Sequence, residues 1–304
     1  MPPALQIAAA DISLAPPMAP AQDVLSGIRH PGRPADARVE AVETGIVPIV
    51  GSLRVGHDVT SEVHRLFREA GCRGGVVQLQ GGRCQPFQFV GPAYASDDVH
   101  AVWYSTARAP ADGAAIAAAT AIVGWRDGAP FLHCHGTWDI GGAALAAGHM
   151  LTSDSIVSEP IAITGFGTRT ACFESLPDEE TNFTLYTPRG DSMAGGSLLL
   201  RLRPHEDLCG AIEAACRRHG IASALVYGIG SLISPRFEDG EGLACRVTEI
   251  AIERGVISDG VAHLDIAAVD VDGTVRNGRV RRGENPVCVT FELVVVGLGG
   301  WGRA

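Results

Sequence analysis

The sequence predicts an α/β protein built from two tandem copies of one unit. Three observations support this prediction: an internal repeat, a capped amphipathic helix in each copy, and alternating apolar and polar residues around the helices. After a shift of 149 positions, residues 53–81 align with residues 202–230 without a gap, and seven of the 29 positions are identical. Each copy therefore reads as strand, helix, strand.

The same kind of helix is predicted in both copies, after Asp58 and after Asp207. An aspartate at this position accepts hydrogen bonds from free amides of the first helical turn, and Gly71 and Gly220 suit the left-handed residue just past a helix end. Between these caps, apolar side chains recur on one helical face: Val59, Val63, Leu66, Phe67 and Ala70 in the first copy, and Leu208, Ile212, Ala215 and Cys216 in the second.

Residues 131–139 alternate in the manner of a β-strand and carry two histidines. The period of two places His133 and His135 on one face of the strand, with Cys134 on the other face. Gly141 and Gly142 indicate a turn, after which a returning strand brings His149 back towards the first two histidines.

Three imidazoles converging in this way predict a metal site. Three protein ligands leave one coordination position open, as in catalytic zinc centres, so His133, His135 and His149 are expected to bind zinc or another divalent transition metal. The alternative is that these histidines are hydrogen-bonded residues of a polar cavity. Asp139 lies on the same strand face and is the candidate catalytic base; the alternatives are that it orients a distal group or begins the turn.

The second copy has changed at the equivalent positions. With an offset of 130, His263 aligns with His133, Asp265 with His135 and Arg279 with His149. Arginine stays protonated and offers only hydrogen-bond donors, so this second site is expected to bind a carboxylate or phosphate group of a substrate.

Composition sets the class of protein. Of 304 residues, 46% are hydrophobic and 19% charged, with a formal charge of -10. No apolar segment reaches the length of a bilayer span, no secretory signal is evident, and the eight cysteines are scattered, so we expect a cytoplasmic protein without a membrane partner. The acidic balance makes nucleic acid an unfavourable partner, although residues 276–282 form a local basic stretch.

Residues 131–151 resemble the signature of the plant and prokaryote conserved (PPC) domain, also called the domain of unknown function 296 family. The segments 202–207 and 228–232 resemble the family's helix cap and its glycine-serine turn. The resemblance implies a strongly bent, mostly antiparallel sheet flanked by a few helices, a homotrimer, and histidines placed where bacterial members hold zinc.

The resemblance also fixes the expected domain boundaries. These are an N-terminal Pro/Ala-rich arm (1–37), a first PPC-like domain with the histidine site (38–172), a linker (173–194), a second, degenerate PPC-like domain (195–298) and a tail (299–304).

Plant members carry a DNA-binding hook with an Arg-Gly-Arg-Pro core. Here the corresponding residues are Pro31-Gly32-Arg33-Pro34, and the missing arginine removes one of the two side chains that would enter the minor groove.

The function that the histidine site favours is a metal-dependent enzyme, of lyase, hydratase, isomerase or hydrolase type, that acts on a small carboxylate-bearing metabolite. The alternatives are a DNA-associated or regulatory trimeric module and a metabolite-binding scaffold without chemistry.

Overall fold

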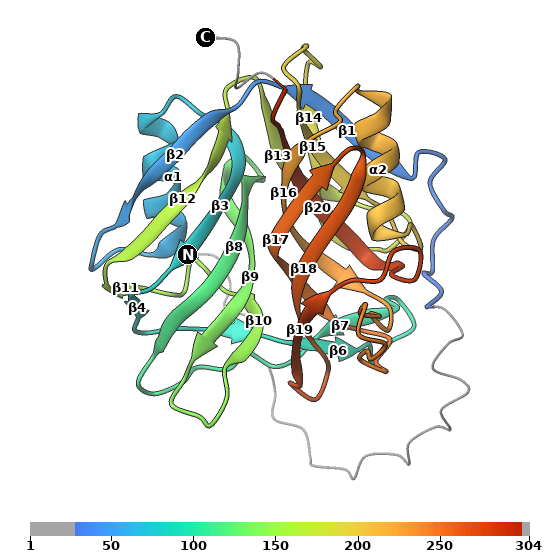
Figure 1. Cartoon of the computed structure of the whole chain (residues 1–304). Helices are drawn as coiled ribbons and strands as arrows, with labels where there is room; N and C mark the ends of the chain where they lie inside the picture. Colours follow the sequence, from blue (N-terminus) through green and yellow to red (C-terminus); the bar gives the residue numbers. More distant parts are fainter. Residues whose placement is uncertain (1–27, 300–304) are drawn as a thin grey trace.

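The computed structural model describes residues 28–299 and shows two sheets packed face to face, each covered on its outer side by one helix. The layers run from α1 (Val59–Glu69) through the two sheets to α2 (Leu208–Arg218), as Figure 1 shows. Residues 1–27 of the predicted arm and 300–304 of the predicted tail lie outside the described residues.

The first sheet belongs mostly to the N-terminal half. Its main path is β2 (Val47–Leu53), β12 (Ile161–Thr168), β3 (Gly74–Gln80), β8 (Ala114–Arg126), β9 (Ala129–Asp139), β10 (Ala146–Met150) and β5 (Phe89–Val90). Attached to this path are β4 (Arg83–Cys84), β11 (Val157–Glu159), β13 (Ala171–Pro177) and β14 (Thr184–Gly190). A separate hairpin is formed by β6 (Pro92–Tyr94) and β7 (Val102–Tyr104).

The second sheet has the order β1 (Val39–Thr44), β15 (Ser197–Leu202), β20 (Val287–Gly297), β16 (Ala224–Leu232), β17 (Glu249–Ser258), β18 (Val261–Val269) and β19 (Val275–Arg279). The order β15-β20-β16-β17-β18-β19 repeats the order β2-β12-β3-β8-β9-β10 of the first sheet. The strands paired by this comparison are those that the sequence offsets of 149 and 130 align. The internal repeat therefore corresponds to two sheets of the same topology.

The mostly antiparallel sheet that the family resemblance implies is confirmed, whereas the α/β label fits only loosely because the described residues contain only two helices. Among the described strand pairs only β8 and β13 run parallel. The reason is local: β8–β9 and β17–β18 are joined by tight Asp-Gly turns, at 127–128 and 259–260, with positive φ at both residues. Such turns fold a strand back beside its predecessor, whereas a parallel sheet needs long crossovers.

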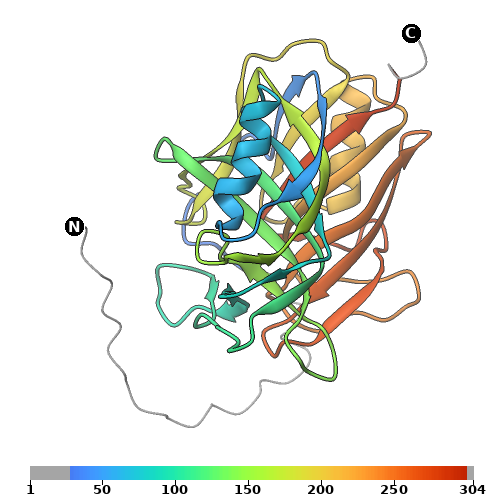
Figure 2. The ribbon, with the colours of Figure 1, turned by 90° about the vertical axis from the view of Figure 1, so that its left-hand side faces the viewer.

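Both helices have the predicted caps. The Asp58 carboxylate accepts a hydrogen bond from the Ser61 amide, and the Asp207 carboxylate accepts one from the Gly210 amide. Gly71 and Gly220 follow the helix ends with φ of +67° and +68°. Figure 2 shows α1 lying across the outer face of the first sheet. Neither helix is long and apolar enough to cross a membrane.

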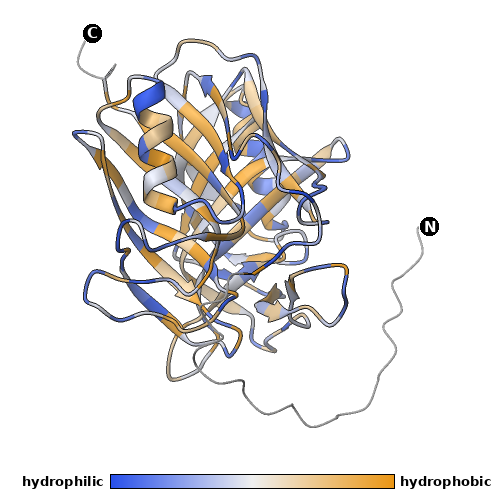
Figure 3. Cartoon of the chain, turned by 90° about the vertical axis from the view of Figure 1, so that its right-hand side faces the viewer, coloured by the Kyte–Doolittle hydropathy of each residue, from blue (hydrophilic) through white to orange (hydrophobic). Residues whose placement is uncertain are grey.

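Apolar side chains fill three layers. One cluster lies between α1 and the first sheet, and another lies between α2 and the second sheet. A third cluster lies between the two sheets and joins residues of both halves: Val76, Ile122 and Phe173 from the first, and Leu199, Ile229 and Val294 from the second. Figure 3 shows the hydrophobic colours running along the strands of the second sheet and one side of α2. This shared layer holds the inner face of β9 against the second sheet.

Two segments differ from the predicted domain boundaries. β1 belongs to the second sheet, where Val39 pairs with Leu202 and Thr44 with Ser197. The predicted linker 173–194 forms most of the β13–β14 hairpin, and Tyr186 of that hairpin is buried between the sheets. The structure thus places β1, which the prediction assigned to the first domain, in the second sheet, and it places most of the predicted linker in the first sheet.

Candidate metal centre

The three histidines meet on the face of the first sheet that is turned towards the second. His133 and His135 lie on β9, and His149 lies on β10 directly opposite His135. As strand parity predicts, Cys134 and Trp138 point the other way, into the cluster beneath α1. The strand that was predicted to return after the glycine turn is β10, and it brings His149 beside His135.

A glycine pair beside the histidines lets the neighbouring strands β5 and β8 pack closely against β10 and β9. Gly148 lies opposite Gly136, and Gly148 has a φ of +153°. A Cβ on Gly148 would lie 2.3 Å from the Val90 carbonyl oxygen, and one on Gly136 would lie 2.5 Å from the Ala118 oxygen. A side chain at Gly148 would therefore clash with β5, and one at Gly136 would clash with β8, the strands that flank the β9–β10 pair.

The candidate ligand atoms are close enough to share one ion. Across the three rings these nitrogens all lie within 4.8 Å of one another, and His133 Nε2 is 3.0 Å from His135 Nε2. Bonds near 2 Å in a tetrahedral zinc site place ligand nitrogens about 3.3 Å apart. The spacing of the first two rings is close to this value, and the third lies within 4.8 Å of both.

The outer nitrogens of two rings are held by the second sheet. His135 Nδ1 donates to the Ile250 carbonyl at 3.0 Å, and His133 Nδ1 bonds the Glu292 carboxylate. Because the carbonyl can only accept, the neutral His135 ring carries its lone pair on Nε2, facing His133 Nε2. If His133 donates to Glu292 in the same way, two lone pairs face each other, an arrangement that a cation between them, a proton or a metal ion, would stabilise.

Burial keeps two of these rings neutral. It lowers the pKa of His135 and of His149 well below the ordinary value, and the charge that His133 would carry lowers both further. His149 Nδ1 is buried without a hydrogen-bond partner among residues 28–299. Neutral imidazole is the form that binds a metal, so the donor set fits a divalent transition metal.

Two buried glutamates of the C-terminal half complete the site. Glu292, 1% exposed, bonds His133. Glu249 is also buried, and in the described part of the chain its Oε2 has no partner. A Cβ on Gly148 would lie 3.4 Å from that oxygen. Burial raises the pKa of Glu249 well above the usual range, which favours a neutral carboxyl beside the histidines.

Sequence reasoning missed both glutamates because they belong to the other half of the chain. A signal was present for Glu292, which is the lone charged residue of the apolar strand Val287–Gly297. A carboxylate in such a strand requires a partner inside the protein. Nothing in one sequence identifies His133 as that partner.

The predicted base Asp139 lies elsewhere. It is exposed at the end of β9, where its carboxylate accepts a hydrogen bond from the Gly141 amide at 2.7 Å. This is the turn-forming role that the sequence left open. The structure does not bring Asp139 into the histidine cluster.

The three second-copy residues also lie apart from the histidines. Arg279 is directly opposite Asp265 on β18 and β19, and its guanidinium donates to both carboxylate oxygens, at 2.9 and 3.1 Å. His263 is exposed on β18. None of the three lines the cavities that border the histidines.

Two hollows border the histidine cluster. A cleft of about 430 Å³ is lined by His133 and His149 together with Tyr104, Tyr186 and Glu292. A smaller hollow of about 50 Å³ is lined by His133, His135 and Glu249. Burial raises the pKa of both tyrosines, so their hydroxyls stay protonated at neutral pH.

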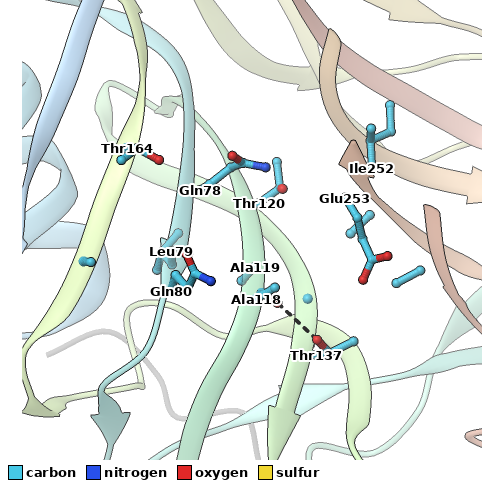
Figure 4. Close-up of a pocket in the computed structure, with 14 residues that line it drawn as sticks. Gln78, Leu79, Gln80, Ala118, Ala119, Thr120, Thr137, Thr164, Ile252 and Glu253 are labelled. Atoms are coloured by element: carbon cyan, nitrogen blue, oxygen red, sulfur yellow. Dashed lines mark hydrogen bonds between the residues drawn. The ribbon is translucent and has the colours of Figure 1, made fainter. Parts of the chain in front are cut away.

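A further cavity of about 250 Å³ lies between the sheets and presents amides, hydroxyls and one carboxylate, that of Glu253. In Figure 4, Gln78, Thr120 and Thr164 extend from the first sheet, and Ile252 and Glu253 lie across from them. Thr137 donates to the Ala118 carbonyl at 3.5 Å. This cavity is distinct from the histidine cluster.

The local basic stretch at residues 276–282 is neutralised by carboxylates. Arg276 pairs with Asp239 and Glu241, and the other three arginines of the stretch each pair with one carboxylate: Arg279 with Asp265, Arg281 with Glu284 and Arg282 with Glu213. The hook-like residues are also engaged, since the Gly32 amide donates to the Glu180 carbonyl at 3.0 Å.

The model of one known protein family matches the C-terminal part of the chain. Residues 190–299 match the model of the Plants and Prokaryotes Conserved (PCC) domain, the family that the sequence motifs resemble. This segment therefore carries a domain of that family. No curated protein matches the chain.

Solved structures give partial matches. A metal-containing protein from Archaeoglobus fulgidus aligns with a TM-score of 0.37 and 18% identity, over 48% of this chain and 95% of its own. A plant- and prokaryote-conserved protein from Pyrococcus horikoshii has a TM-score of 0.37 and 14% identity, over 46% and 90%. A Ralstonia eutropha protein whose name proposes DNA binding has a TM-score of 0.34 and 18% identity, over 46% and 89%.

Proposed function

We propose that this protein is a metal-dependent enzyme whose ion is held by His133, His135 and His149. The observation that carries the proposal is the convergence of their nitrogens within 4.8 Å. Support comes from the second sheet, which holds the outer nitrogens of His133 and His135 through Glu292 and the Ile250 carbonyl. Such outer contacts fix the orientation of metal-binding imidazoles.

Zinc is the ion we favour, because three neutral imidazoles with one open position are typical of catalytic zinc. A bound divalent metal polarises a carbonyl group or lowers the pKa of a water molecule. The reaction classes that use this chemistry without a further cofactor include lyases, hydratases, isomerases and hydrolases.

The chain's own residues divide the remaining work. Glu292 orients the His133 ring through its bond to Nδ1. Glu249, held neutral by burial, has a proton on its carboxyl that it can donate to an oxygen of the substrate in the hollow that it shares with His133 and His135. Glu249 thus takes the proton-transfer role for which Asp139 was the candidate. The substrate is a small molecule bearing a carboxylate, held in the adjoining cleft.

We also infer that the two halves are copies of one domain and that each chain has one metal centre. The repeated strand order supports the first statement. The ion pair of Arg279 with Asp265, in the register where the first copy has His149 and His135, supports the second.

Elemental analysis of the chain, purified without chelator, tests the proposal. We expect about one equivalent of metal per chain, and a loss of at least nine tenths of it in His135→Ala and His149→Ala. His263→Ala, at the position equivalent to His133, is the matched control and should keep the metal. Less than one tenth of an equivalent in the unaltered protein would contradict the proposal and favour a metal-free binding scaffold.

A further inference from the structure

Arg126 ends strand β8 at the mouth of the histidine cleft. It lines the cleft together with His133 and His149, and the centre of its guanidinium lies 5.2 Å from the centre of the Phe131 ring. Burial raises the pKa of Tyr104 and of Tyr186, and the Arg126 charge opposes both rises. The cation therefore faces the same space as these hydroxyls and the histidines.

No carboxylate neutralises this cation within residues 28–299. Arg126 is exposed and forms no ion pair. The one carboxylate lining the cleft belongs to Glu292, which is buried and bonded to His133. Arg279, the anchor expected from the sequence, is by contrast occupied by Asp265.

Three aromatic side chains line the same cleft as Arg126: Trp103, Phe183 and His100. Trp103 is 43% exposed although it packs 5.5 Å from Phe183 and 4.3 Å from His100, measured between ring centres. The side chain of Asn182 donates to the Val99 carbonyl at 2.8 Å and so fastens the loop before Trp103 to the β13–β14 hairpin. A cleft that holds both an exposed aromatic surface and an unpaired cation is suited to a ligand that is apolar and planar at one end and anionic at the other.

We propose that the cleft binds an organic acid with a planar, aromatic body, whose carboxylate pairs with Arg126 while its ring lies against Trp103 and Phe183. A guanidinium offers two parallel donors to a carboxylate, which fixes its orientation. The volume of about 430 Å³ suits a molecule of this size. This inference rests on the proposed function in one respect, namely that the far end of the acid reaches the metal held by His133 and His149.

Binding of benzoate to the full chain loaded with zinc tests the inference. Isothermal calorimetry should detect benzoate, whereas benzamide, which has the same shape without the charge, and acetate, which lacks the ring, should bind at least roughly tenfold more weakly. Arg126→Gln should weaken benzoate binding at least roughly tenfold, and Trp103→Ala should weaken benzoate more than acetate. Arg254→Gln, at an exposed arginine away from the cleft, is the matched control and should leave binding unchanged.

The outcomes separate this inference from the proposed function. Benzoate binding that is unchanged in Arg126→Gln, or no binding to a protein that does hold zinc, would overturn the inference and leave the metal centre standing. If the protein holds no zinc but binds benzoate through Arg126, the acid site stands and the proposed function falls. Metal content measured on every variant tells these results apart.

Discussion

His149 on β10 lies directly opposite His135 on β9, on the sheet face that is turned towards the other half of the chain. The same register in the second sheet places Arg279 opposite Asp265, where the two side chains form an ion pair. One backbone arrangement thus carries a pair of histidines in the first sheet and a self-neutralised ion pair in the second. The difference in side chains explains why only one copy is expected to hold a metal.

Arg279→Ala should have little effect. Its ion pair with Asp265 is on the surface, with 42% of the arginine side chain and 29% of the aspartate side chain exposed. Exposed pairs contribute about 0–1 kcal/mol to stability. We expect urea unfolding to show a loss of less than about 1 kcal/mol, with unchanged metal content and benzoate binding. A loss of ligand binding would restore Arg279 as the substrate anchor.

Glu292→Gln should weaken the metal site without removing a ligand. The carboxylate bonds His133 Nδ1 and so orients the ring. Loss of an outer contact of this kind costs roughly 10- to 100-fold in metal affinity. A zinc titration against a chelator of known affinity measures the effect, and Glu253→Gln, on β17 away from the histidines, serves as the control. Equal affinity in Glu292→Gln and the unaltered protein would argue against this role.

Glu249→Gln should stabilise the metal-free protein at neutral and higher pH. The folded state raises the pKa of Glu249 above the unfolded value of about 4.3, so it holds more protons than the unfolded state above that pH. Stability therefore falls as the pH rises towards the folded pKa, by up to about 1.4 kcal/mol per pH unit. Glutamine removes this dependence.

Urea unfolding of the chelator-treated proteins between pH 4 and pH 8 measures the difference. The advantage of Glu249→Gln should be small near pH 4 and grow with pH. Parallel curves for the two proteins would show that Glu249 ionises as readily in the folded state as in the unfolded one, which would remove its role as a proton donor.

We expect that the protein does not bind duplex DNA. The arginines of the 276–282 stretch are paired with carboxylates, and the chain has a formal charge of -10. We expect no mobility shift at low salt with micromolar protein. A shift that disappears steeply as salt is raised would instead support the DNA-associated alternative, because that dependence reports release of counterions from phosphates.

Much of the local structure could be predicted from the sequence. The caps at Asp58 and Asp207 set where the helices begin, and alternation put His133 and His135 on one face of β9. These are short-range effects. The site's second half could not be predicted, because Glu249, Glu292 and Ile250 approach the histidines only after two sheets that are distant in sequence pack together. The homotrimer stays a prediction.

The metal centre is best examined in a crystal structure of the chain purified without chelator, with diffraction data on both sides of the zinc absorption edge. We expect one anomalous peak per chain, within about 2.0–2.1 Å of a nitrogen from each of His133, His135 and His149. Well-ordered histidine rings around ordinary water or empty space, with zinc supplied in the crystallisation medium, would contradict it.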